Sequence, residues 1–361
     1  MSLASWHESR FDVAWREVTG AVGDTVTVLP IVVAVAALTD LGLGRLLLGF
    51  GLFQVVWGLY YGHPMSVEPM KALAALVIAG GLSGGEYVAA GLLAGGVLLL
   101  IGTTGTLGRL APYVGEPVVR GIQVGVALIL LRTGVTTGLG DPRLAALSVV
   151  VALGAVVLGY RDAAALVVLG VGAAVAVTAG GSITPRLPSL ALLDIGALAF
   201  SRDAVGATLG QLAMTVGNAA VATSLLVEEY FDAEASPDEL STSMGLMNLL
   251  ALPFGAMPMC HGSGGVAGKY AFGARTATSN LVLGGVYLLL AVVAVDAVAA
   301  FPMAVLGVVL VLVALELGRA GIDTEDPLLA GGIGVVALLT NVGVAFGVGL
   351  VGYHALARWR A

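Results

Sequence analysis

The sequence predicts an all-α polytopic membrane protein, and three observations carry this prediction. Of the 361 residues, 58% are hydrophobic and 11% are charged, whereas a soluble domain has about 25% charged residues. The apolar residues form continuous runs, as membrane helices of about 20 residues require, rather than the alternating segments of an outer-membrane barrel. Glycine is abundant, with 53 residues, and small residues let membrane helices pack closely.

About fourteen segments are expected to span the membrane. The first seven lie near residues 17–38, 46–62, 65–80, 87–108, 116–135, 143–159 and 163–179. The second seven lie near 203–226, 240–257, 259–273, 277–298, 302–317, 327–341 and 342–357. A segment with Pro185 and Pro188 separates the two sets. We therefore expect a first domain at residues 1–183 and a second at 184–361, with no soluble C-terminal domain.

An internal repeat supports this division. A shift of 194 residues places Glu17 on Gln211, Asp24 on Asn218, Gln54 on Asn248, Gly51 on Gly245, and Pro64-Met65 on Pro258-Met259. Two halves of seven spans each have opposite orientations, because an odd number of crossings reverses the direction of the chain. The sequence therefore predicts seven plus seven spans as inverted repeats, which many secondary transporters contain.

Basic residues favour a cytoplasmic N-terminus, because cytoplasmic loops carry an excess of Lys and Arg. In that orientation the cytoplasmic side receives Arg10, Arg16, Arg109, Arg120, Arg161, Arg275, Arg319, Arg358 and Arg360. The outer side receives Arg45, Arg132, Arg143, Arg186 and Arg202. We expect a multi-pass protein of the cell membrane with both termini in the cytoplasm.

Two polar segments interrupt the apolar pattern at equivalent places in the two halves. They are HPMSVEPMKALAALVIAGG at residues 63–81 and FGAMPMCHGSGGVAGKY at residues 254–270. Proline breaks a helix and favours an extended neighbour. Each segment is thus expected to form a short extended piece, at 65–68 and 259–262, followed by a half-helix. The half-helices would begin at Pro69, which suits a first helical position, and near Ser263.

The two half-helices predict an anion site. Irregular backbone at membrane depth is tolerated only where it is buried in protein or lines a polar cavity. Inverted symmetry would bring the two N-termini together, and each offers free N–H groups and a partial positive charge. The candidate binding residues from these segments are Ser66, Glu68, Met70, Lys71, His261, Gly262, Ser263, Gly264 and Gly265. The glycines would let backbone amides approach a bound group.

The first span of each half supplies the other polar candidates. Glu17 and Asp24 lie two turns apart, and Gln211 and Asn218 are their neutral counterparts. Asp24 fits either a binding role or a packing hydrogen bond, and Glu17 fits an interfacial role. Glu68 would compete with an anionic substrate unless it took up a proton. Glu68, Asp24 and Glu17 are therefore candidates for proton coupling, with sodium as the alternative coupling ion.

The remaining polar residues indicate no enzyme, metal site or cofactor. Cys260 and His261 lack the other ligands of a metal site, and adjacent residues on an extended piece point to opposite faces. His261 fits either a pathway-lining role or a structural hydrogen bond. Lys71 is expected at the site or beside a carboxylate, whereas Lys269 is expected to extend to the membrane interface. The GSGG segment lacks the GK[ST] ending of a phosphate loop.

These segments resemble a known family. PMSVEPMKALAA at residues 64–75, FGAMPMCHGSGGVAGKYAFGAR at 254–275 and GAVGDTVTVLPI at 20–31 are similar to the signature motifs of the molybdate transporter family, a branch of the sulfate permease superfamily. Three residues depart from the family pattern: Glu68 replaces a usual Gln, and Ser263 and Lys269 replace common Ala and Gln. The first departure bears on the coupling ion, and the others bear on substrate choice.

The resemblance implies a secondary active transporter in which a core domain moves against a gate domain. It implies uptake of molybdate, held between the third and tenth spans, with tungstate or sulfate as related oxyanions. The expected partners are the oxyanion, a coupling proton or sodium, the lipid bilayer and a second copy in a homodimer, but no nucleic acid. A nucleobase or other small-solute permease of the same fold, or an anion channel, remains the alternative.

Overall fold

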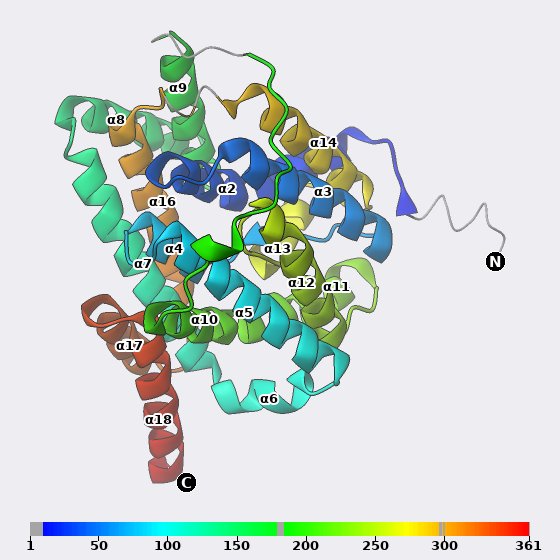
Figure 1. Ribbon diagram of the computed structural model, residues 1–361, viewed down its shortest axis with the longest axis vertical. Helices are drawn as coiled ribbons and strands as arrows, with labels where there is room; N and C mark the ends of the chain where they lie inside the picture. Colours follow the sequence, from blue (N-terminus) through cyan, green and yellow to red (C-terminus); the bar gives the residue numbers. More distant parts are fainter. Residues whose placement is uncertain (1–9, 179–183, 296–297, 299, 361) are drawn as a thin grey trace, which may run out of the picture.

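The computed structural model describes residues 10–178, 184–295, 298 and 300–360, and the fold within them is mainly helical (Figure 1). The first half contains α2 (Trp15–Leu38), α3 (Leu43–Tyr61), β1 (Glu68–Pro69), α4 (Lys71–Ile78), α5 (Gly84–Thr103), α6 (Leu107–Val114), α7 (Glu116–Gly138), α8 (Pro142–Val157) and α9 (Ala164–Thr178). The predicted boundary at 183/184 borders residues 179–183, which lie outside the described residues.

The second half repeats this order of elements. It contains a 3-10 turn at Ile195–Ala197, α10 (Arg202–Met214), a π-helix at Thr215–Ala222, α11 (Thr223–Phe231), α12 (Pro237–Ala251), a 3-10 turn at Leu252–Phe254, β2 (Met259–Cys260), α13 (Ser263–Ala271), α14 (Thr278–Val293), α16 (Met303–Ile322), α17 (Pro327–Leu339) and α18 (Val342–Arg360). The helices α10 and α11 continue into each other through the π-helix and form a 30-residue unit.

Several of these helices begin where the sequence supplies a cap. Ser83 and Glu86 form a capping box at the start of α5, in which each side chain accepts a hydrogen bond from the other residue's backbone N–H. Asp141 and Asp326 accept backbone N–H groups at the starts of α8 and α17, and proline follows both residues. These caps satisfy N–H groups that have no partner inside a helix.

Each predicted span contains a helix, but several helices are shorter than the predicted spans. Within the described residues, six helical units are long and apolar enough to cross a membrane, and four shorter apolar helices accompany them. The prediction that the first half-helix begins at Pro69 is wrong. Pro69 lies in β1 opposite Met259, the Met70 N–H donates to the Pro258 carbonyl, and α4 begins at Lys71. Proline fits this short strand because it has no N–H to donate.

The sequence prediction missed α6 and the π-helix. The span predicted for residues 87–108 ends earlier, since α5 stops at Thr103 and Gly105 adopts a left-handed conformation with φ 63°. The following α6 is tied to the second half because its Leu107 N–H donates to Asp238 Oδ1 at 2.9 Å. Its apolar stretch is too short to give a membrane-span signal.

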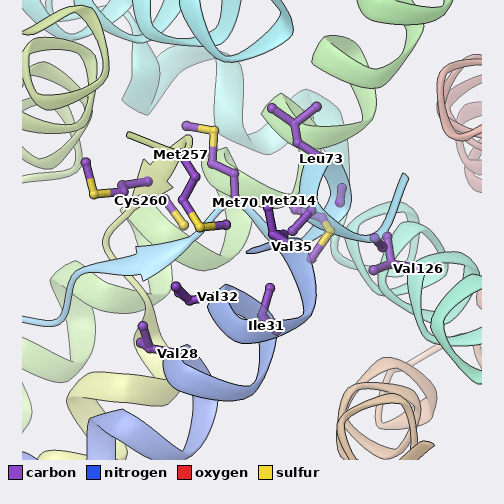
Figure 2. Close-up of a cluster of buried hydrophobic side chains, with 14 of the residues drawn as sticks. Val28, Ile31, Val32, Val35, Met70, Leu73, Val126, Met214, Met257 and Cys260 are labelled. Carbon is purple, nitrogen blue, oxygen red and sulfur yellow. The ribbon is translucent and has the colours of Figure 1, made fainter. Parts of the chain in front are cut away.

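The two extended pieces pair with each other and form the centre of the molecule. β1 and β2 are antiparallel, with Glu68 opposite Cys260 and Pro69 opposite Met259. Figure 2 shows apolar side chains around this pair, including Ile31, Val32 and Val35 from α2 together with Met70, Leu73, Met214 and Met257. A buried apolar layer therefore surrounds the only strands among the described residues.

Helix pairs join the two halves through small residues. α7 packs on α16, α3 on α14 and α5 on α12. At the α7–α16 crossing, a Cβ on Gly134 would lie 2.7 Å from the Gly307 carbonyl oxygen, and a Cβ on Gly307 would lie 2.6 Å from the Gly134 carbonyl oxygen. The backbones approach so closely that only glycine fits there, as expected for membrane helices.

Gly134→Ala should therefore destabilise the protein by about 1–3 kcal/mol, because the added methyl group would force the two backbones apart. The thermal unfolding midpoint of purified protein in detergent measures this effect. Gly332→Ala is the matched control, since a Cβ at Gly332 of α17 meets nothing within 4 Å. That control should be neutral or slightly stabilising. Equal midpoints for the two variants would contradict the close crossing.

Candidate substrate-binding site

The strand pair fixes the starts of the two half-helices α4 and α13, which follow β1 and β2 almost directly. Figure 1 shows both half-helices in the middle of the molecule, between α2 and α10. Each N-terminus has backbone N–H groups without a partner inside the helix and a partial positive charge. The partners of these groups therefore show what each N-terminus can bind.

The N-terminus of α4 is occupied by a neutral side chain. Gln211 Oε1 accepts hydrogen bonds from the N–H groups of Ala72 at 2.9 Å and Leu73 at 3.4 Å. The Gln211 amide nitrogen donates in turn to Thr215 Oγ1 at 3.0 Å. Gln211 was predicted as a substrate ligand from its repeat position. In this structure it lines the cavity described below and also caps α4.

The N-terminus of α13 is occupied by a carboxylate. Glu68 Oε1 accepts a hydrogen bond from the Gly265 N–H at 2.6 Å, and Glu68 Oε2 pairs with Lys71 Nζ at 2.5 Å. Ser263 Oγ donates to Asn218 Oδ1 at 2.9 Å. The N–H groups of Ser263 and Gly264 have no acceptor among the described residues. The N-terminus of α13 thus binds one anionic group, and two of its backbone N–H groups remain available to a ligand.

Gly262 and Gly265 permit this arrangement. A Cβ on Gly262 would lie 2.0 Å from Glu68 Cδ, and a Cβ on Gly265 would lie 2.1 Å from Ser66 Oγ. Any side chain at either position would displace the carboxylate. The predicted role of these glycines, close approach of the backbone to an anionic group, is therefore met by the protein's own Glu68.

A small cavity lies beside Glu68. The space open to the centre of a water molecule is about 30 Å³, and one water needs roughly 10–15 Å³ of such space, so the cavity holds about two waters. Eight predicted residues line it: Glu68, Lys71, Gln211, Asn218, His261, Gly262, Ser263 and Gly264. Four others do not: Asp24, Ser66, Met70 and Gly265. Met214, Thr215 and Ala219 line it without having been predicted.

Met214, Thr215 and Ala219 have a common source. They lie on or beside the π-helix Thr215–Ala222, which places Asn218 beside Ser263. π-Helical turns are frequent at functional sites because they alter which side chains share a face. The only sequence signal was the helical spacing of Thr215, one turn beyond Gln211.

Lys269 is buried beside Asp24, so the prediction that it extends to the membrane interface is wrong. Both side chains are fully buried, and Lys269 Nζ lies 3.2 Å from Asp24 Oδ2. The ammonium group also donates to Gln54 Oε1 at 3.0 Å, the Met65 carbonyl at 2.7 Å and Asn280 Oδ1 at 2.9 Å. A buried charge is tolerated only when it is paired and hydrogen-bonded, and Lys269 meets both conditions.

Ser66 connects this ion pair to the cavity. Its hydroxyl donates to Asp24 Oδ1 at 2.7 Å and lies 3.4 Å from Glu68 Oε1. One chain of contacts therefore joins two carboxylates in the middle to an ammonium group at each end: Lys71, Glu68, Ser66, Asp24 and Lys269. Asp24 belongs to the support of the site rather than to its lining.

Glu17 lies away from the cavity. Its carboxylate is fully buried and accepts the N–H groups of Arg275 at 3.0 Å and Thr276 at 3.2 Å. The expected interfacial position of Glu17 stays a prediction. The carboxylate ties α2 to the turn that follows α13 and satisfies backbone groups there.

His261 combines both roles that the sequence left open. It lines the cavity and is fully buried, and its Nδ1 lies 2.8 Å from the Ser66 carbonyl oxygen, which can only accept. Nδ1 is therefore a protonated nitrogen, and Nε2 lies 2.8 Å from Ser243 Oγ. Neighbouring Cys260 also lines the cavity.

Two amide side chains satisfy the strand backbone. Gln54 donates to the Val67 carbonyl at 3.3 Å and to Asp24 Oδ2 at 2.8 Å. Asn248 accepts the Met259 N–H at 2.8 Å and donates to the Met259 carbonyl at 2.6 Å. These residues occupy matching positions in the repeat. Their contact with the extended pieces was not predicted. The sequence did indicate that they are equivalent, because they are separated by the 194 residues of the repeat.

The Asp24–Lys269 pair gives a stability prediction. Lys269→Met should cost about 3–5 kcal/mol, because it leaves the buried Asp24 carboxylate without a counter-charge. Asp24→Asn with Lys269→Met should cost clearly less than the two single changes added together. Thermal unfolding midpoints of the four proteins in detergent complete the cycle. Additive losses would show that the two residues do not stabilise each other.

Comparison with known proteins agrees with the resemblance noted in the sequence. The family described as "Molybdate transporter of MFS superfamily" matches the chain twice, at residues 16–130 and 203–317. Molybdate transporter 2 of Arabidopsis thaliana is 30% identical, over 94% of this chain and 87% of the relative. Molybdate transporter 1 of Chlamydomonas reinhardtii is 27% identical, over 98% of this chain and 93% of the relative.

Solved structures share the fold at low sequence identity. The transmembrane domain of the cyanobacterial bicarbonate transporter BicA has a TM-score of 0.67 and 18% identity, over 93% of this chain and 98% of that one. The murine Slc26a9 anion transporter in the inward-facing state has a TM-score of 0.73 and 14% identity, over 100% of this chain and 72% of that one. With two family matches and close relatives over nearly its whole length, the chain belongs to the molybdate transporter family.

Proposed function

We propose that this protein is a secondary active transporter that takes up a tetrahedral oxyanion, most simply molybdate, with tungstate or sulfate as alternatives. The substrate binds between the N-termini of α13 and α4. One observation carries the proposal: Glu68, an anionic group, is held at the α13 N-terminus by the Gly265 N–H and the Lys71 ammonium. The same donors, with the free amides of Ser263 and Gly264, suit the oxygens of a bound oxyanion.

The relatives support the choice of substrate, since those matched over most of their length are named molybdate transporters. The donors around the cavity are backbone amides, the Ser263 hydroxyl and one ammonium group, which bind oxygen atoms without recognising a ring. A nucleobase would instead need carboxylate oxygens free to accept hydrogen bonds, and both oxygens of Glu68 already have donors.

The proposed architecture is seven plus seven spans in inverted repeats, within the sulfate permease superfamily. The two family matches have equal length and fall one in each half. The packing has the symmetry of such a repeat. In the proposed repeat α3 corresponds to α12, and α5 corresponds to α14. α3 packs on α14, and its counterpart α12 packs on α5. The half-helices follow the same rule, since α13 packs on α2 and α4 packs on α10.

Proton coupling follows from the place of Glu68. A dianion cannot share the α13 N-terminus with an ionised carboxylate, because like charges a few ångströms apart repel strongly. Uptake of a proton by Glu68 would release Lys71 and the Gly265 amide to the substrate. Asp24 would then respond through Ser66, which lies between the two carboxylates. Glu17 has no such connection to the cavity among the described residues, and we assign it a structural role.

Alternating access requires the site to open to each face in turn. We assign the Arg120 end of α7 to the cytoplasm, as the distribution of basic residues favours, with both termini on the same side in the cell membrane. We also propose a homodimer. The molar mass of the purified protein in detergent tests this proposal.

Competition binding tests the substrate. Labelled molybdate should bind purified protein in detergent, unlabelled tungstate and sulfate should displace it to different degrees, and uracil should leave it bound. The physical reason is that the amide and ammonium donors match oxyanion oxygens. Ser263→Leu with Gly264→Leu should abolish binding while the protein stays monodisperse, since bulky side chains would fill the cavity. Displacement of a labelled nucleobase, without any molybdate binding, would exclude this function.

Glu68→Gln tests the coupling. Wild-type uptake should rise as the pH falls, because protonated Glu68 no longer competes with the oxyanion. In the variant the charge is absent at every pH, so molybdate should bind at least as tightly at neutral pH and the pH dependence of uptake should flatten. Uptake into proteoliposomes, measured with and without an imposed pH gradient, gives both quantities. A variant with the full wild-type pH dependence would remove Glu68 from coupling.

A further inference from the structure

A second, larger cavity adjoins the central one. It lies between α2, α7 and α16 and has a volume of about 330 Å³. Four residues line both cavities: Lys71, Asn218, Ser263 and Gly264. We call this second cavity the vestibule. Because the two cavities share these walls, the vestibule adjoins the α13 N-terminus.

The opposite face has a separate cavity. It has a volume of about 490 Å³ and lies by the C-terminal ends of α4 and α7, where Arg132 and Thr133 line it. Among the described residues it shares no lining residue with the central cavity. Leu73 and Val126, both fully buried, belong to the apolar cluster at the centre of the molecule (Figure 2). Arg120 and Arg132 thus mark opposite ends of α7, about 18 Å apart along the helix axis.

The vestibule is lined by a hydrogen-bond donor that no described protein group accepts. Gln123 is 3% exposed and lines this cavity. Its Oε1 lies 3.5 Å from Arg120 Nη1, and its amide nitrogen donates to no acceptor among the described residues. This amide nitrogen is not among the buried atoms that lack a partner, so it is open to the cavity. An oxyanion oxygen would satisfy it, and Arg120, which uses Nε to bind Glu116 at 2.8 Å, could contribute its terminal nitrogens.

Glu316 gives the vestibule its charge. Its half-buried side chain lines the cavity and has no ion-pair or hydrogen-bond partner among the described residues. Arg120 and Lys71 are already paired with Glu116 and Glu68. The other charged groups that act on Glu316 are Arg319 on its own helix, and Arg161 and Asp162 before α9. An ionised Glu316 therefore opposes the arrival of an oxyanion.

We propose that the vestibule is a second oxyanion-binding station, in which Gln123 and Arg120 supply the donors and Glu316 acts as a charge gate. The station rests on the proposed oxyanion transport and adds a site between the central one and the Arg120 face. When Glu316 takes up a proton, its repulsion disappears and an oxyanion can exchange between Gln123 and the amides of Ser263 and Gly264. Acidification should then raise the apparent affinity from the vestibular face alone.

The test measures transport from each face separately. Labelled molybdate uptake is followed in proteoliposomes in which the protein has one known orientation, with the substrate on either side. Gln123→Met and Arg120→Gln should raise KM on the order of tenfold from the vestibular face, because local attraction is lost. Glu316→Gln should lower KM from that face by a similar factor at neutral pH and flatten its pH dependence. All three variants should leave KM from the opposite face unchanged.

Arg132→Gln is the matched control, because it removes an arginine from the same helix at the unconnected cavity. It should change KM only from the opposite face. Equal effects of Gln123→Met or Glu316→Gln on both faces, or no effect on either, would overturn the station. A misfolded variant cannot mimic the result, since Glu316→Gln is expected to improve affinity. If the wild-type protein transports the oxyanion but the variants change KM equally from both faces, the station is refuted and the proposed function stands. If the wild-type protein transports no oxyanion, the proposed function is refuted as well.

Discussion

The structure depends on how two breaks in the helical backbone are satisfied in the middle of an apolar protein. At membrane depth an unpaired backbone group has no water to bind. The breaks solve this problem together, since β1 and β2 pair with each other and Gln54 and Asn248 bind the adjacent backbone groups. The half-helices that follow then start at fixed points. Their N-termini face the cavity because the strands hold them there.

Charge balance is the second constraint. Glu68 and Asp24 bring two carboxylates into a buried region, and Lys71 and Lys269 bring two ammonium groups. With Ser66 between the carboxylates, each charge has a partner of opposite sign. In the proposed mechanism, an arriving dianion would disturb this balance at Glu68, the carboxylate that lines the cavity. Substrate binding and proton uptake would then be linked by the same electrostatic requirement, while the Asp24–Lys269 pair would stay neutral.

The sequence indicated the apolar helices and the two broken segments, because continuous apolar runs and paired prolines are local signals. Eight of the residues predicted from those breaks and the repeat line the central cavity, and their role in binding stays a prediction. The burial of Lys269 could not be predicted, since its partner Asp24 lies 245 residues earlier in the chain. The local pattern favours a lysine that extends to the membrane interface. The π-helix, α6 and the start of α4 at Lys71 depend on tertiary contacts. The occupation of the α13 N-terminus by Glu68 also required the pairing of two distant segments.

The pairing of β1 with β2 has a consequence for selectivity. Glu68 lies in β1 and its amide partner Gly265 lies in α13, so the binding groups come from both halves of the chain but are joined by the strand hydrogen bonds. Motion that separated α4 from α13 would expose backbone groups to a dry interior. The two half-helices should therefore travel as one carrier. The same groups would then contact the ion at both surfaces of the membrane. The selectivity among ions should therefore be the same at uptake and at release.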